Sequence, residues 1–72
     1  MMDYSKLRGK IVEVFGSQYA FAEAMGMSAA AIGQRLNGKT QWSAPEMVKG
    51  CDVLGVPLEE VHLYFCQRSL DF

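Results

Sequence analysis

Apolar residues recur at intervals of three and four along almost the whole chain, which is the spacing of one face of an α-helix. No stretch alternates between apolar and polar residues as a half-buried strand does. The pattern predicts five helices, which begin near residue 3 or 5 and at residues 18, 29, 44 and 58, and end at residues 15, 25, 36, 54 and 66. The fold class is therefore all-α, in a single domain of residues 1–72. The side chains expected to face inward are Leu7, Ile11, Val14, Phe15, Phe21, Ala22, Met25, Ile32, Leu36, Met47, Val48, Cys51, Leu54, Leu58, Val61 and Phe65.

Glycines and serines mark the ends of the predicted helices. Gly16, Gly26 and Gly55 each follow the last apolar residue of a helix. Glycine commonly ends a helix because it adopts the left-handed conformation without strain, and we expect Gly26 to do so. Ser17 and Ser28 precede the second and third helices, where a serine hydroxyl accepts a hydrogen bond from the first turn.

The fourth helix has the most complete start signal. Ser43 and Glu46 form an S-x-x-E capping box, with Pro45 in the first helical turn. Trp42 and Met47 occupy the two positions of a hydrophobic staple. Trp42 could also stack on a nucleic-acid base, but its staple position favours packing within the protein.

Only three residues separate the second and third predicted helices. Among them, Met27 stands where it would clamp onto Ile32 as a hydrophobic staple and so set the angle between the two helices. Gln18 lies in the first turn of the second helix, where unpaired backbone N–H groups favour an anion such as phosphate. Two short helices joined by a tight turn form a helix-turn-helix, here at about residues 18–37.

The composition is that of a small globular domain. A chain of 72 residues, half of them apolar, can bury one modest core. It has no apolar run of membrane-spanning length, and its first residues lack the apolar stretch of a signal peptide. We therefore expect a cytosolic protein with no membrane or small-molecule partner and no cofactor, in which Cys51 and Cys66 are core residues rather than a disulfide.

The sequence gives little support for a metal site or a catalytic site. His62 is the only histidine and stands one helical turn before Cys66. Together with Cys51 these residues could hold a metal ion, but a closed structural zinc site needs four ligands and no fourth is evident. No motif places a nucleophile near His62, so a surface or core-edge histidine is the better interpretation. The sequence favours a protein that is not an enzyme.

The charges are unevenly distributed. The net charge of −1 argues against strong non-specific binding to nucleic acids. Residues 1–45 carry five basic and three acidic side chains, a balance of +2, whereas residues 46–72 carry two basic and five acidic side chains, a balance of −3. The predicted helix-turn-helix lies in the less acidic part, which is compatible with a surface that faces phosphate.

Residues 18–39 follow the pattern Q-x-x-F-A-x-x-x-G-x-S-x-x-x-I-x-x-x-L-N-G-K, and residues 53–61 read VLGVPLEEV. This combination resembles the lambda-repressor-like family of Cro/cI-type, or XRE-like, helix-turn-helix proteins, in which the second stretch joins the fourth and fifth helices. The resemblance covers nearly the whole chain. It implies a compact helix-turn-helix domain and a small transcription regulator of a phage or mobile element that binds operator DNA as a homodimer.

The resemblance also implies which residues contact double-stranded DNA. The first residue of the second helix would contact the backbone, the third helix would face the bases, and the loop after it would reach phosphates. The implied residues are Gln18, Ser28, Ala29, Ala30, Gly33, Gln34, Asn37 and Lys39. Helix geometry agrees in part, because Ile32 and Leu36 facing inward would turn residues 30, 34 and 37 outward.

The recognition helix departs from the family at its start. Relatives often have Gln, Ser or Arg where this chain has Ala29, Ala30 and Ala31. Alanine can contact a thymine methyl and Gln34 can pair with adenine through two hydrogen bonds. Alanine is equally the best helix former, so both interpretations of the three alanines stay open. Much of any specificity would then come from DNA shape and dimer spacing.

Three further positions concern charge. Ile11 and Leu36 stand where some family members have Arg and Glu as a partly buried ion pair. Here we expect the two apolar residues to pack together, which avoids the cost of desolvating charges. In isolation Arg35 is interpreted as an ordinary solvated charge.

Residues 33–40, GQRLNGKT, satisfy the P-loop expression G-x-x-x-x-G-K-[ST]. A P-loop needs a strand before it and a helix directly after it, so that backbone amides surround the phosphates. Here a predicted helix precedes the loop, with Ile32 and Leu36 buried, and no parallel sheet fits in the length. We therefore reject nucleotide hydrolysis.

Two functions remain. The first is a dimeric, sequence-specific regulator that inserts the third helix into the major groove of DNA. The second is a protein-binding helix-turn-helix module, an antirepressor or assembly partner, with weak or no DNA binding. The acidity of the chain and its apolar C-terminal residues favour a partner or dimer surface at residues 63–72. The apolar residues there are Leu63, Tyr64, Leu70 and Phe72, which do not all fit on the inward face and so predict an exposed apolar strip.

Overall fold

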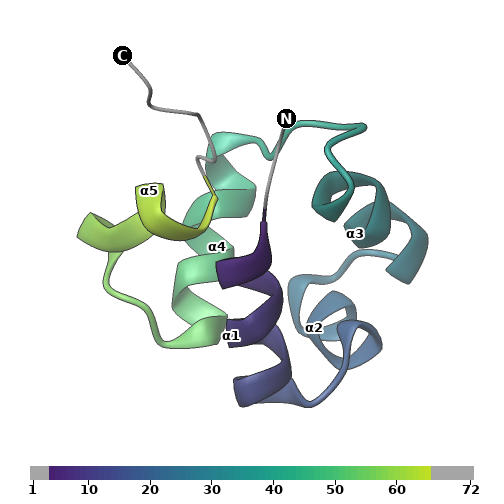
Figure 1. Ribbon diagram of the computed structural model, residues 1–72, viewed down its shortest axis with the longest axis horizontal. Helices are drawn as coiled ribbons and strands as arrows, with labels where there is room; N and C mark the ends of the chain where they lie inside the picture. Colours follow the sequence, from purple (N-terminus) through teal and green to yellow (C-terminus); the bar gives the residue numbers. More distant parts are fainter. Residues whose placement is uncertain (1–3, 66–72) are drawn as a thin grey trace.

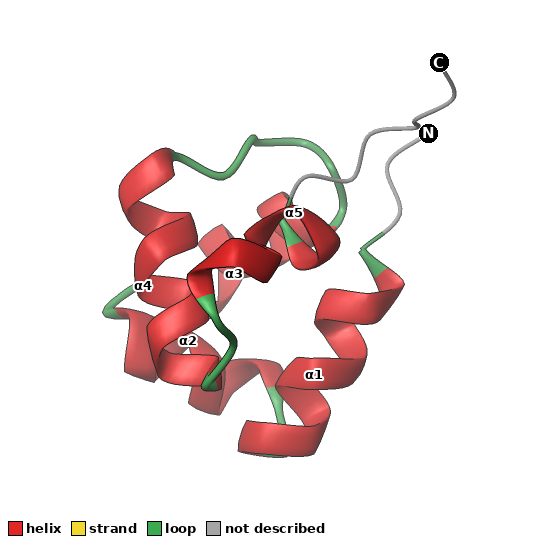
Figure 2. Cartoon of the chain, turned by 90° about the vertical axis from the view of Figure 1, so that its left-hand side faces the viewer, coloured by secondary structure: helices red, strands yellow, loops and turns green. Residues whose placement is uncertain are grey.

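The computed structural model of this protein describes residues 4–65, so the predictions for Cys66, Leu70 and Phe72 lie outside the described residues. All regular elements in this range are helical (Figures 1 and 2). The all-α prediction is confirmed. The elements are α1 (Ser5–Phe15), α2 (Gln18–Met25), α3 (Ala29–Leu36), α4 (Ala44–Leu54), a short 3-10 turn (Leu58–Glu60) and α5 (Val61–Tyr64).

The predicted ends of α2 and the predicted start of α3 are confirmed by their hydrogen bonds, whereas the fifth helix, predicted from residue 58, begins as a 3-10 turn and becomes α-helical only at Val61. The hydroxyl of Ser17 accepts a hydrogen bond from the backbone N–H of Ala20, and that of Ser28 accepts one from Ala31, at 3.2 and 3.1 Å. Gly26 has a φ of 72° and donates its N–H to carbonyls in the last turn of α2. This left-handed conformation lets the chain leave α2 and begin α3 within three residues.

The capping box of α4 is also formed. The hydroxyl of Ser43 accepts a hydrogen bond from the backbone N–H of Glu46 at 3.3 Å, and a carboxylate oxygen of Glu46 accepts one from the backbone N–H of Ser43 at 2.9 Å. Two otherwise unpaired backbone donors at the start of α4 are satisfied in this way.

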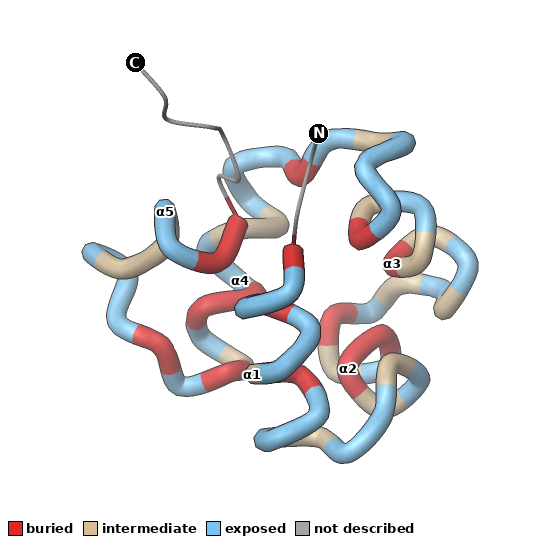
Figure 3. Tube along the Cα trace, in the orientation of Figure 1, coloured by how far each residue is buried: buried red, intermediate tan, exposed pale blue. Residues whose placement is uncertain are grey.

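The core lies where α1, α2 and α4 meet (Figure 3). Helix α2 packs against α1, α3 and α4, and its Phe21 is fully buried. Phe21 also contacts the partly buried Phe15, with ring centroids 5.7 Å apart. Burying one such side chain contributes about 2–3 kcal/mol. At the other end of the core, the ring of Trp42 meets that of Phe65 edge to face at 5.0 Å.

Three side chains predicted to face inward are exposed instead, namely Val14, Val48 and Leu58. The buried face of α4 centres on Gly50, Cys51 and Leu54. At about 100° per residue Val48 is turned away from this face. Val14 lies beside the buried stripe of α1, and Leu58 belongs to the 3-10 turn, in which helical periodicity does not apply.

Of the two residues of the predicted apolar strip that the structure describes, Leu63 is 42% exposed, whereas Tyr64 is buried and does not contribute to an exposed strip. The ring of Tyr64 lies under the ammonium group of Lys6 from α1, which is 5.2 Å from the ring centroid. Because α5 is a single turn, its packing against α1 and α4 decides which of its side chains is buried. No helix in residues 4–65 has the length and apolar character needed to span a membrane.

Gly50 makes room for Phe65. A Cβ atom at residue 50 would lie 2.5 Å from Cζ of Phe65 and within 3.3 Å of two further ring atoms. Gly50 therefore costs some helix propensity but allows α4 to accept an aromatic ring against its backbone.

We expect Gly50→Ala to lower the free energy of unfolding by about 1–3 kcal/mol, because the added methyl group overlaps a buried ring. Gly9→Ala is the matched control, since Gly9 is also helical and a Cβ there meets nothing within 4 Å. This control should raise the free energy of unfolding by about 0.5–1 kcal/mol. Urea denaturation measures both, and equal stabilisation by the two alanines would contradict the close packing at Gly50.

Candidate nucleic-acid interface

Helix α3 turns one side into the core and the other to solvent. Ile32 and Leu36 are buried, whereas Ala30, Gln34 and Asn37 are exposed, as predicted from helix geometry. Met27, in the turn before α3, is partly buried and packs against the core. Figure 1 shows α2 and α3 on one side of α1 and α4, with α5 on the other. The helix-turn-helix therefore occupies one flank of the molecule with an open outer side.

Gln18 lies against α3. Its side chain is half-buried, and its Nε2 atom is 3.3 Å from the position that a Cβ on Gly33 would occupy. The absence of a side chain at Gly33 thus lets Gln18, the first residue of α2, approach the backbone of α3. These two predicted DNA-binding residues are brought together.

The three alanines of α3 have different surroundings. Ala29 is half-buried and packs against the core, and Ala31 is half-buried. Ala30 alone among them is exposed. Ser28 is exposed too, with its hydroxyl oxygen occupied by the N-cap hydrogen bond. Of the four consecutive residues, only Ser28 and Ala30 therefore project from the outer side.

The loop after α3 begins with residues predicted to reach phosphates. Asn37 ends the helix, Gly38 follows with a φ of 77°, and the backbone N–H of Lys39 donates to the carbonyl of Gln34 at 2.8 Å. This hydrogen bond folds the loop back onto the helix. Asn37 and Lys39 are both exposed at this end.

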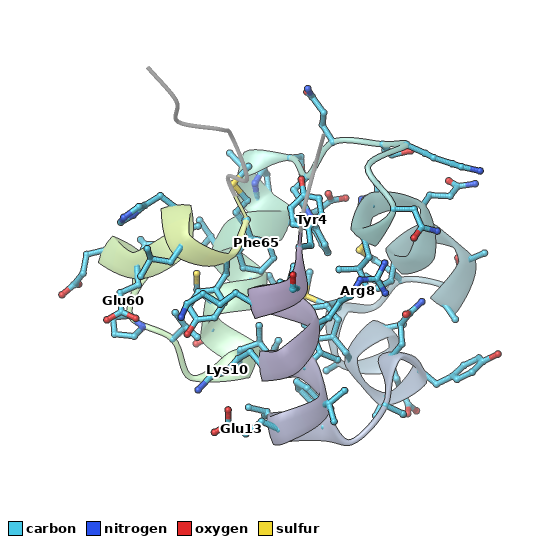
Figure 4. All side chains as sticks on the ribbon, viewed as in Figure 1. Tyr4, Arg8, Lys10, Glu13, Glu60 and Phe65 are labelled. Carbon is cyan, nitrogen blue, oxygen red and sulfur yellow. The ribbon has the colours of Figure 1, made fainter. Side chains whose placement is uncertain are left out.

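Arg8 joins this group from α1 and was not predicted from the sequence. Its Nη2 donates to the backbone carbonyl of Leu36 at 3.2 Å and to Oδ1 of Asn37 at 2.9 Å. Figure 4 shows the Arg8 side chain extending from α1 toward α3. The sequence did hold one hint of this role: Arg8 stands one helical turn before Ile11, and some relatives carry an arginine at the position of Ile11.

Arg35 is not the solvated charge that the sequence indicated. Its Nε and Nη2 donate to the two carboxylate oxygens of Glu46 at 2.9 and 3.0 Å, and its Nη1 donates to the carbonyl of Ala31 at 3.0 Å. The two charged side chains are only 16% and 22% exposed. Because Glu46 belongs to the capping box of α4, this ion pair joins α3 directly to the start of α4.

The Arg35 hydrogen bonds lower the pKa of the Glu46 carboxyl below its usual value, against a smaller opposite effect of burial. The hydrogen bond from the backbone of Ser43 lowers this pKa further. The carboxylate of Glu46 is therefore held ionised by the same contacts that orient α3.

The alternative sites are not assembled in the described residues. The first half of the P-loop expression, Gly33–Leu36, is helical, so the backbone amides do not form a phosphate-binding loop. Within residues 4–65 no three His, Cys, Asp or Glu side chains gather as a metal site, but the predicted alternative of Cys51, His62 and Cys66 includes a residue outside this range and stays a prediction. Trp42 is 4% exposed, so its packing role is confirmed and its ring has no free face for a base.

Known proteins share this fold. The chain is 42% identical to the modulator of repression (MOR) of the temperate bacteriophage TP901-1 from Lactococcus lactis, over 89% of this chain and 86% of that one, with a TM-score of 0.78. The clp gene regulator ClgR from C. glutamicum is 20% identical over 90% of this chain and 86% of that one, with a TM-score of 0.72. The DNA-binding domain of the P22 C2 repressor is 16% identical over 94% and 88%, also with a TM-score of 0.72. No curated protein sequence matches the chain.

The fold and the exposed third helix define a lambda-repressor-like helix-turn-helix domain, as the resemblance implied. The chain belongs to the family described as a protein of unknown function (DUF739), whose sequence profile matches residues 1–68.

Glu46→Gln tests the ion pair between α3 and α4. We expect it to lower the free energy of unfolding near pH 7 by about 1–2 kcal/mol, because it removes a charge-assisted pair from a partly buried place. Glu13→Gln, which breaks the exposed contact of 3.8 Å between Lys10 and Glu13, is the control and should cost less than about 0.5 kcal/mol. The residues of this control pair are labelled in Figure 4.

Glu46→Gln should also change how the free energy of unfolding depends on pH. A carboxyl whose pKa is lowered by folding stabilises the protein fully above its unfolded pKa of about 4.3, and this stabilisation is lost as the pH falls through the lower folded pKa. The parent should therefore lose more stability than Glu46→Gln in this acidic range. If the free energies of unfolding of the parent and of Glu46→Gln differed by the same amount at every pH, this result would contradict the lowered pKa of Glu46.

Proposed function

We propose that this protein is a DNA-binding transcription regulator of the phage-repressor type, which inserts α3 into the major groove of operator DNA as a homodimer. The observation that carries this proposal is the open outer side of α3. Gln18 stands beside its middle, and Asn37 and Lys39 stand exposed at its C-terminal end. Hydrogen-bond donors on two sides of an exposed helix can contact the two phosphate backbones that border a DNA groove.

Each predicted residue has a role in this interface. Gln34 and Ala30 face the bases, where the amide can pair with adenine and the methyl group can contact thymine. Ala29 packs against the core and Gly33 lies beside Gln18, so these two residues place no large side chain between α3 and the base edges. The hydroxyl of Ser28 can still donate to a phosphate, because its N-cap hydrogen bond uses only the oxygen.

A second function is favoured by the chemistry of the same surface. The exposed side of α3 offers one alanine and one glutamine, and Tyr19, which follows Gln18 in α2, is 76% exposed. Tyrosine is frequent in protein interfaces. The 42% identical phage protein is named a modulator of repression rather than a repressor. A protein-binding module that acts on another regulator is therefore the alternative.

Selection from a pool of random DNA duplexes separates the two functions. Enrichment of a half-site, repeated as a palindrome, is expected for the dimeric regulator. A pool that stays random after selection at low salt would reject the DNA-binding proposal and favour the protein-binding module.

Lys39→Ala should weaken binding to the selected duplex and reduce the slope of log K against log salt by about one, because one phosphate contact is lost. Lys49→Ala removes an equal charge from an exposed residue of α4 that lies outside the proposed interface, and it should leave the slope unchanged. The double variant Gln34→Ala, Lys39→Ala should bind more weakly still. Binding of this double variant as tight as that of the parent would show that the interface is elsewhere.

Homodimerisation through the C-terminal residues is tested by sedimentation. The full chain should sediment as a dimer at high concentration, and deletion of residues 67–72 should shift it toward the monomer. A full chain that stays monomeric, with no change on deletion, would contradict a dimer surface at the C-terminus.

A further inference from the structure

Arg8 links two elements that are far apart in the sequence. It lies in α1, yet its Nη2 contacts Leu36 and Asn37, 28 and 29 residues further along the chain. Arg8 is exposed, so this contact is not a consequence of burial in the core. The guanidinium group stands beside the C-terminal end of α3.

The hydrogen bond from Arg8 to Leu36 satisfies a backbone carbonyl at the C-terminal end of α3. The last carbonyl groups of a helix lack partners within it, and the C-terminal end carries a partial negative charge. The basic residue in the last turn of α3, Arg35, is occupied by Glu46 and by the carbonyl of Ala31. Arg8 therefore supplies from α1 the positive charge that this end requires.

The contact with Asn37 determines how its amide is turned. An asparagine amide has one oxygen that accepts and one nitrogen that donates, whereas a guanidinium group only donates. Oδ1 of Asn37 must therefore face Arg8. The Nδ2 group, with two N–H donors, is turned away from Arg8 on an exposed residue.

We propose that Arg8 is a positioning residue of the DNA interface, which holds Asn37 so that its Nδ2 donates to a DNA phosphate. This inference rests on the proposed DNA-binding function. Arg8 acts through Asn37 in this arrangement, and its own charge is directed at Leu36 and Asn37. A neutral amide that donates to phosphate adds affinity but releases no counterion, so it contributes little to the salt dependence.

The test compares Arg8→Gln, Asn37→Ala and the double variant on the duplex selected from the random pool. Each single variant should bind about tenfold more weakly, as expected for one lost hydrogen bond to a charged group. The double variant should bind no more weakly than the worse single variant, because both changes remove the same contact. Arg8→Gln should leave the salt slope unchanged, unlike Lys39→Ala.

Lys10→Gln is the matched control, since it removes one positive charge from α1 and breaks only the exposed contact with Glu13. It should change affinity by less than about twofold. Asn37→Asp separates the stability of the Arg8 contact from DNA binding. Its carboxylate keeps an acceptor for Arg8, so thermal stability should be maintained, but it has no donor for phosphate and binding should fall at least tenfold.

Three results would overturn the inference. If the losses of affinity in Arg8→Gln and Asn37→Ala were additive and Arg8→Gln reduced the salt slope, Arg8 would contact phosphate itself. If Arg8→Gln bound the duplex as tightly as Lys10→Gln, Arg8 would have no role in the interface. Both results leave the DNA-binding proposal intact. A parent protein that binds no duplex at low salt rejects the DNA-binding proposal and this inference together.

Discussion

The orientation of α3 is the constraint on which this structure depends. The helix has eight residues and buries only Ile32 and Leu36. A helix of this length is marginal on its own in water, so tertiary contacts must both stabilise and orient it. The turn at Gly26 and the packing on α2 set its direction. The bidentate pair between Arg35 and Glu46 then holds α3 to the start of α4.

These supporting contacts shape the chemistry of the exposed surface. Arg35 and Arg8 lie on or beside α3, yet both donate to groups within the protein. Lys39 is left as the exposed cation of the loop, among neutral donors such as Gln18 and Gln34. The surface is therefore weakly charged for a nucleic-acid interface, which agrees with a net charge of −1. In the proposed function, affinity for DNA would then depend more on close fit and on the proposed dimerisation than on charge.

Local signals explain why so much of the fold was predictable. Ser17, Ser28 and the box of Ser43 with Glu46 act on backbone groups a few residues away, so their effect is independent of the rest of the fold. The outward side of α3 followed as well, because Ile32 and Leu36 define its buried side. Where a helix end or a single turn lacks strong periodicity, as at Val14 and Tyr64, burial depended on neighbours that no local pattern specifies.

Helices α1–α4, their ends and the helix-turn-helix could be predicted from the amino-acid pattern, because they depend on backbone hydrogen bonds and apolar spacing within one segment. The roles of Arg8, Arg35 and Gly50 became apparent only from the packed helices. Each acts on a partner from another helix or segment: Arg8 on Asn37, Arg35 on Glu46, and Gly50 on Phe65. Such partners meet only after the core has formed, since the packing of α1, α2 and α4 sets the distances between them.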